Sequence, residues 1–192
     1  MKIARIVSSA SHIDYIARVI DELDAIEAPK AEDYGFGQFV AVDRGGIDAV
    51  GIVYNSVLAN PEYANFGPRL SPKPALELFS PDFLSEQGVL LGVLMIGTVQ
   101  TGHGIPRSVI PPGAVVESLS ADAVHRFHAD GSGGVRLHYY PQVLDHAGIY
   151  AIPLLENIID QLSAVAGEES RKRLDVLKNS LSWQRTMGAQ RF

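Results

Sequence analysis

The sequence predicts an α+β fold, in which a β-barrel-like body forms the N-terminal part and a pair of helices follows it. Two observations carry this prediction. Runs rich in valine and isoleucine, bounded by glycine and proline, dominate the chain up to about residue 120, which is typical of strands. After Pro141 the apolar residues recur at helical spacing instead. Strands that come first and helices that come last indicate an α+β domain.

The first strands follow from alternation and from turn chemistry. Residues 2–9 alternate loosely and form a predicted strand. Residues 13–20 fit helical and strand spacing, and β-branched neighbours favour the strand. The clearest hairpin joins residues 36–42 to residues 49–58 through Asp43-Arg44-Gly45-Gly46, because glycine adopts the positive φ of a tight turn.

The middle of the chain alternates between loop and strand signals. Residues 60–74 contain four prolines and little periodicity, which predicts a long ordered loop. Residues 75–79 suit a short strand, and Ser80 suits the cap of a helical turn. Residues 88–100 are apolar on both faces, as in a central strand, and residues 114–119 form the last predicted strand.

Three helices are expected after the strands. Ser120 is a suitable cap for a short helix over residues 121–128. A helix with Pro153 in its first turn carries the apolar stripe Leu154, Leu155, Ile158, Ile159, Leu162 and Val165 and ends at Gly167. The next helix begins near residues 168–170 and carries Leu174, Leu177 and Leu181 on one face. We therefore expect a β domain over residues 1–120, with a mostly helical region, residues 121–192, packed on it.

Composition excludes several classes of function. The chain has no cysteine, which rules out disulfides, thiolate metal sites and a cysteine nucleophile, and agrees with a reducing compartment. No phosphate-binding Gly-x-x-x-x-Gly-Lys-Ser/Thr motif and no Gly-x-Ser-x-Gly elbow is found. We therefore predict no catalytic residue and no cofactor.

Charge and hydropathy suggest where the protein works. The N-terminus carries charges where a signal peptide needs an apolar stretch, and the longest apolar run, residues 89–99, is shorter than a membrane span. We expect a cytoplasmic protein without membrane contact. The net charge of −6 disfavours general nucleic-acid binding, although residues 168–192 hold six Lys/Arg against three Asp/Glu.

Four segments resemble a known barrel family. They are Gly37-Gln38-Phe39-Val40-Ala41-Val42, Val50-Gly51-Ile52-Val53-Tyr54, Gly92-Val93-Leu94-Met95-Ile96-Gly97-Thr98-Val99 and Ile110-Pro111-Pro112-Gly113-Ala114-Val115-Val116. Together they resemble the HAS-barrel of HerA-type ATPases and of the ATP synthase, over roughly residues 2–120. The resemblance implies a subunit-packing and partner-docking role, with the ATPase domain itself missing. Expected partners are another copy of the chain or a protein such as an ATPase in a DNA-processing complex.

Histidines support an alternative hypothesis, a metal-dependent hydrolase. His125 and His128 stand at i, i+3 on the predicted helix, a usable spacing for metal ligands, and His138 follows nearby. No acidic residue completes a known ligand motif with them. The prediction is therefore that no metal is bound and that the histidines are ordinary surface or half-buried residues.

The C-terminal helix carries the predicted partner interface. The stripe Leu174, Leu177, Leu181 with the neighbouring Trp183 would be costly in water if the preceding helix left it uncovered. Arg171-Lys172-Arg173 and Trp183 leave single-stranded nucleic acid open as a partner, but a solvated helix face explains the charges more simply. We therefore expect self-association or docking through this face.

Overall fold

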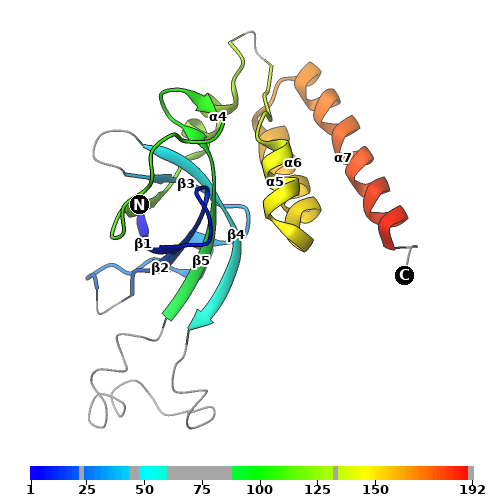
Figure 1. Cartoon of the computed structure of the whole chain (residues 1–192). Helices are drawn as coiled ribbons and strands as arrows, with labels where there is room; N and C mark the ends of the chain where they lie inside the picture. The colour runs from blue at the N-terminus through cyan, green and yellow to red at the C-terminus, as the bar shows by residue number, and fades with distance from the viewer. Residues whose placement is uncertain (22–23, 44–47, 60–87, 132–133, 190–192) are drawn as a thin grey trace.

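The computed structural model describes residues 1–21, 24–43, 48–59, 88–131 and 134–189. Along this part of the chain the strands come first and the longer helices last (Figure 1). The strands are β1 (Lys2–Ser9), β2 (Asp14–Val19), β3 (Phe39–Val42), β4 (Ala49–Ala59), β5 (Gly88–Thr98), β6 (Gly102–His103) and β7 (Val115–Ser118). A short 3-10 helix, η1 (Ala31–Tyr34), lies between β2 and β3.

Six strands close into an antiparallel barrel. Around the barrel they follow the order β2, β1, β7, β3, β4 and β5, and β2 pairs back onto β5 to close the ring. β6 pairs with the end of β5. The predicted α+β fold with an N-terminal barrel and C-terminal helices is confirmed.

The burial pattern differs between the strands: β2 alternates, whereas the first half of β4 and the second half of β5 are buried on both faces. In β2, Tyr15, Ala17 and Val19 are buried while the residues between them are half-buried, which settles the ambiguous segment as a strand. Fully buried side chains from the barrel strands join those of the helices in one continuous core. Among them are Ile3, Ala4, Phe39, Val40, Ile52, Leu91, Leu94, Met95, Ile96 and Val116.

The predicted hairpin is present as β3 and β4, which pair antiparallel with Phe39 opposite Ile52 and Val42 opposite Ala49. Residues 44–47 of its turn lie outside the described residues. The predicted loop over residues 60–74, the strand over 75–79 and the helical turn at Ser80 also fall outside them. The strands predicted near residues 88–100 and 114–119 are found as β5 and β7.

The C-terminal helices are α4 (Ala121–His128), α5 (Tyr140–His146), α6 (Ala151–Val165) and α7 (Glu168–Ala189), with a 3-10 turn, η2 (Gly148–Tyr150), before α6. Ser120 caps α4 as expected, because its hydroxyl accepts the amide of Ala123 at 3.3 Å. Helix α5 is not among the helices expected from the sequence. No helix among the described residues combines the length and apolar content needed to cross a membrane.

α7 packs along α6 and is the outermost of the C-terminal helices (Figure 1). α6 buries its apolar stripe, including Leu154, Ile158 and Leu162. Polar contacts at the rim of the helix pair join Lys178 to Asp160, Ser182 to Glu156 at 3.0 Å and Arg185 to Glu156 at 3.0 Å. Surface pairs of this kind contribute little each, so the buried apolar stripe provides most of the packing energy.

Candidate functional site

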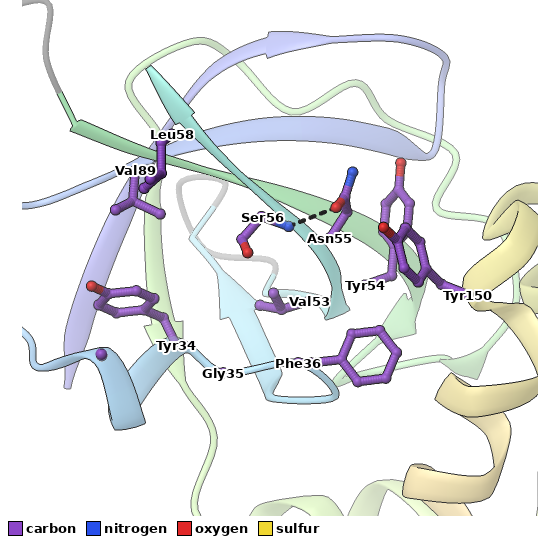
Figure 2. Close-up of a pocket in the computed structure, with 11 residues that line it drawn as sticks. Tyr34, Gly35, Phe36, Val53, Tyr54, Asn55, Ser56, Leu58, Val89 and Tyr150 are labelled. Atoms are coloured by element: carbon purple, nitrogen blue, oxygen red, sulfur yellow. Dashed lines mark hydrogen bonds between the residues drawn. The ribbon is translucent and has the colours of Figure 1, made fainter. Parts of the chain in front are cut away.

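An apolar recess opens between the outer end of β4 and the segment that leads into β3 (Figure 2). We call it the β4 recess. Its volume is about 460 Å³, and the aromatic rings of Tyr34, Phe36, Tyr54 and Tyr150 line it. Leu58, whose side chain is 81% exposed, continues the apolar wall toward solvent. A recess of this size, lined by aromatic groups, lies within the range of known ligand and peptide pockets.

Backbone groups at the outer end of β4 are turned away from β5. Met95 donates its amide to the carbonyl of Ile13 at 2.7 Å, so its backbone faces β2 rather than β4. The side to which a residue's amide and carbonyl point alternates along a strand. Leu90 is five residues from Met95, so its amide and carbonyl point to β4, where Val57 is its partner. The amides and carbonyls of the two residues beside Val57 therefore point away from β5. These residues are Ser56 and Leu58, and both line the β4 recess.

That edge of β4 is uncovered within the part of the chain that the structure describes. β3 pairs with β4 only as far as Ile52, and Val53 then exchanges hydrogen bonds with Gln38 and Gly37. Past Val53 the described residues provide no further strand on this side. The amide of Ser56 donates to the side-chain oxygen of its neighbour Asn55 at 2.9 Å (Figure 2). We call the backbone of Ser56 and Leu58 the open β4 edge.

Acidic residues are concentrated in the chain segment that leads to the β4 recess. Residues 21–33 hold six Asp/Glu and one Lys, which gives 1 − 6 = −5, and we call this segment the acidic connector. Its η1 part contributes Tyr34's neighbour Asp33 and the exposed Glu32. Arg18 offsets part of the charge by pairing with Asp21 at 3.3 Å. Among the described residues, no Lys or Arg forms an ion pair with Glu32.

A second acidic group stands behind the aromatic wall. The hydroxyl of Tyr54 donates to the carboxylate of Asp14, 2.9 Å from each oxygen. Burial, together with the hydrogen bond and the negative charge of Asp14, raises the pKa of Tyr54 to about 12. The phenol therefore stays protonated at neutral pH and holds the ring in one orientation in the recess.

Histidine and tyrosine side chains form a buried cluster elsewhere, between α4, β6 and α5. The His128 ring is 1% exposed and is held at both nitrogens: Nδ1 lies 2.7 Å from the carbonyl of Val124, and Nε2 lies 2.7 Å from the hydroxyl of Tyr139. Burial is the main cause that lowers the pKa of His128 to about 4, and the charges of His125 and Arg136 act in the same direction. Burial also raises the pKa of Tyr139 well above its usual value. The pair is therefore neutral over the physiological range.

His103 belongs to the same cluster, although it is not among the candidate residues expected from the sequence. Its ring lies 5.2 Å from that of His128, 5.7 Å from that of His138 and 5.0 Å from that of Tyr139, measured between centroids. Burial, followed by the nearby charges of His128, Arg136 and His138, lowers its pKa to about 4. The sequence Gly102-His103-Gly104 is typical of a turn, but the structure forms the short strand β6 there, and no local signal indicates the long-range neighbours of His103.

The three histidines of the hydrolase hypothesis do not converge on one ion. His125 is exposed on α4, and His128 has both nitrogens engaged, while His138 offers its amide to Nδ1 of His103 at 3.2 Å. No group of three or more His, Asp or Glu side chains suited to a metal occurs among the described residues. The cluster therefore packs the junction between barrel and helices by aromatic and hydrogen-bond contacts.

The predicted interface on α7 is only partly exposed. Leu174 and Leu181 are buried against the core, and Leu177 is half-buried and packs on it. The expected exposed leucine strip is therefore not formed, because α6 and the segment around Leu137 cover it. Trp183 is 67% exposed and is the one member of the predicted set that faces solvent.

The basic residues at the start of α7 have partners within the chain. Lys172 pairs with Glu168 at 2.8 Å, and Arg173 pairs with Glu169 at 2.5 Å. Arg171 donates to the carbonyls that end α6, at 3.1 Å to Ser163. These contacts cap one helix and stabilise the next, which gives the charges a structural role.

Fold and site together define a small protein built on a closed six-stranded antiparallel barrel, with C-terminal helices and an open strand edge beside an aromatic recess. The chain belongs to the family described as domain of unknown function DUF8166, whose sequence model matches residues 1–191. None of the curated proteins matches the chain.

Proposed function

We propose that this protein is a non-enzymatic docking module that binds a partner protein at the β4 recess. The observation that carries the proposal is the position of this recess, with four aromatic rings, directly beside uncovered backbone groups of a strand. Aromatic residues are enriched in protein interfaces because they bury a large area with little loss of side-chain entropy. The barrel holds this surface in place.

The barrel itself favours a scaffold over an enzyme. Side chains from its strands are packed into the core, and the buried His128 has both ring nitrogens engaged, by the carbonyl of Val124 and the hydroxyl of Tyr139. Catalytic groups need access to a substrate and a pKa suited to proton transfer near neutral pH. His128, with its pKa near 4 and both nitrogens engaged, has neither.

The HAS-barrel resemblance suggests which kind of assembly the module joins. A closed barrel followed by helices is compatible with that resemblance, and it leads us to propose a ring-forming ATPase of a DNA-processing complex as the partner. Self-association is the second form of docking, and the exposed Trp183 on α7 supports it as a contact. The proposed location is the cytoplasm.

Site-specific photocrosslinking in the source cells tests this proposal. A photoreactive phenylalanine analogue replaces Phe36 at the mouth of the β4 recess, and the matched control carries it at Val176, an exposed position on α7. We expect discrete protein adducts from position 36 and not from position 176, with mass spectrometry identifying the partner. Absence of adducts at position 36, with a co-purifying small molecule in their place, would contradict docking and favour a small-ligand site.

A further inference from the structure

We propose that the open β4 edge takes up an extended basic segment of the partner as an additional strand, with alternate apolar side chains of that segment in the β4 recess. This inference rests on the proposed docking function and adds the chemical class of the partner. It follows from three features: the direction of the backbone groups, the space beside them and the charge around them.

The backbone of the open β4 edge has the spacing of a strand ladder. Ser56 and Leu58 each present an amide and a carbonyl on the same side of β4, two residues apart, as the pairing of Val57 with Leu90 requires. Main-chain hydrogen bonds of this kind provide affinity in β-strand addition, while pockets for alternate side chains provide specificity. The amide of Ser56 now donates to Asn55, a local contact that a partner's carbonyl can replace.

Space for the added strand lies directly beside this edge. A neighbouring strand sits about 4.7–4.9 Å away in the hydrogen-bonding direction. Because Ser56 and Leu58 line the β4 recess, a strand added at this distance would lie within the recess. Tyr34 and Phe36 form the wall of the recess opposite β4 (Figure 2). Side chains of the added strand would stand perpendicular to the sheet, so every second one would lie on the recess face of β4, beside Ser56 and Leu58. Leu58 and Val57, both exposed, gain apolar cover on the two faces of β4.

Charge selects a basic occupant over a second copy of this chain. Ala31 and Tyr34, which enclose Glu32 and Asp33 in η1, line one side of the recess, and Tyr54, which also lines it, donates its hydroxyl to the Asp14 carboxylate. Two copies paired edge to edge would bring two acidic connectors together, which disfavours that dimer. A segment that alternates apolar residues with Lys or Arg satisfies both the recess and its rim.

Selection from a random dodecapeptide library displayed on phage tests the proposal with the full-length protein. We expect enriched peptides with β-branched or aromatic residues at every second position and a net positive charge. Affinity of a synthetic enriched peptide is then measured by fluorescence anisotropy. Failure to enrich any peptide, or enrichment of sequences without alternation, would overturn the proposal.

Variants separate backbone pairing from contact with the recess. Ser56→Pro removes the outward amide and should weaken peptide binding at least tenfold more than Ser56→Ala does, because alanine keeps that amide. Leu58→Asp should also weaken binding at least tenfold, and its matched control Val176→Asp should not. Each variant is first shown by circular dichroism and thermal unfolding to remain folded.

Failure of strand addition and failure of docking give different results. If Leu58→Asp abolishes binding while Ser56→Pro does not, the recess docks a partner through side chains alone, and only the strand-addition inference is lost. If neither variant affects the peptide, the β4 recess is not the docking site and both proposals fail. A wild-type dimer that Ser56→Pro converts to monomer would also overturn the inference, because a second copy would then occupy the edge.

Discussion

Acidification from pH 7 to pH 5 should destabilise the protein, because burial lowers the pKa of both His103 and His128 to about 4, and His128 is the more deeply buried of the two. The His128 side chain is 1% exposed, and burial together with neighbouring charges lowers its pKa to about 4, against about 6.5 in an unfolded chain. Below pH 6.5 the unfolded state therefore takes up a proton that the folded state resists. Stability is fully present above that pH and is lost as the pH falls toward 4.

The size of the effect follows from the two pKa values. The difference between the folded and unfolded pKa values of His128 lowers the free energy of unfolding by about 2 kcal/mol between pH 7 and pH 5. Urea unfolding at both pH values measures the loss in the wild type, in His128→Gln and in His125→Gln. Glutamine at position 128 keeps a polar group near Tyr139 but cannot titrate, so that variant should lose about 2 kcal/mol less than the wild type on acidification.

The variant His125→Gln is the control. His125 lies on the same helix but is exposed, so His125→Gln should show the pH dependence of the wild type. An equal loss of stability in the wild type and in His128→Gln would refute the assignment. So would a wild type whose stability is unchanged at pH 5.

Three further predictions concern packing and the recess. Gly97→Ala should destabilise by on the order of 2 kcal/mol in urea unfolding, because its Cβ would lie 2.3 Å from a backbone oxygen of β6, whereas Gly35→Ala meets nothing within 4 Å and should be nearly neutral. Leu181→Ala should cost about 2–5 kcal/mol because the side chain is fully buried, while Trp183→Ala should cost less than about 0.5 kcal/mol; equal effects would contradict the α6–α7 packing. In an alkaline absorbance titration, Tyr54→Phe should remove a component with a pKa of about 12, and loss of a component near 10 would be inconsistent with the Asp14 contact.

Strands were predictable from the sequence because their signals are local. Residues 2–9 alternate loosely, and the glycines after Asp43 separate two β-prone runs, so these segments indicate their own conformation. Residues 13–20 fit both spacings, and there the β-branched residues favoured the strand that is observed as β2. The cap at Ser120 is local in the same sense. Helix α5 has no comparable pattern, since seven residues are too few to show a 3.6-residue period clearly.

The candidate site was not predictable because its parts come from distant segments. Tyr34, Tyr54 and Tyr150 meet only after the barrel has closed and η2 has packed on it. The open β4 edge depends on where β3 stops pairing, which alternation within β4 does not indicate. Long-range closure, such as the pairing of β2 with β5, decides both features.

The apolar stripe of α7 was also predictable only in part. The spacing of Leu174, Leu177 and Leu181 identifies the apolar face of α7 but not what covers it. In the structure that cover is internal, which buries the leucines and leaves Trp183 exposed. His103 shows the converse, since a histidine between two glycines in β6 becomes part of an aromatic cluster only through Phe127 of α4 and Tyr139 at the start of α5.

Amide hydrogen exchange with and without a selected basic peptide, followed by NMR, measures the central contact most directly. If the partner adds a strand to β4, the amides of Ser56 and Leu58 should exchange at least tenfold more slowly at saturating peptide. The amide of Val57, which already faces β5, serves as the internal reference and should change much less. Unchanged exchange at Ser56 and Leu58 while the peptide is bound would contradict docking at the open β4 edge.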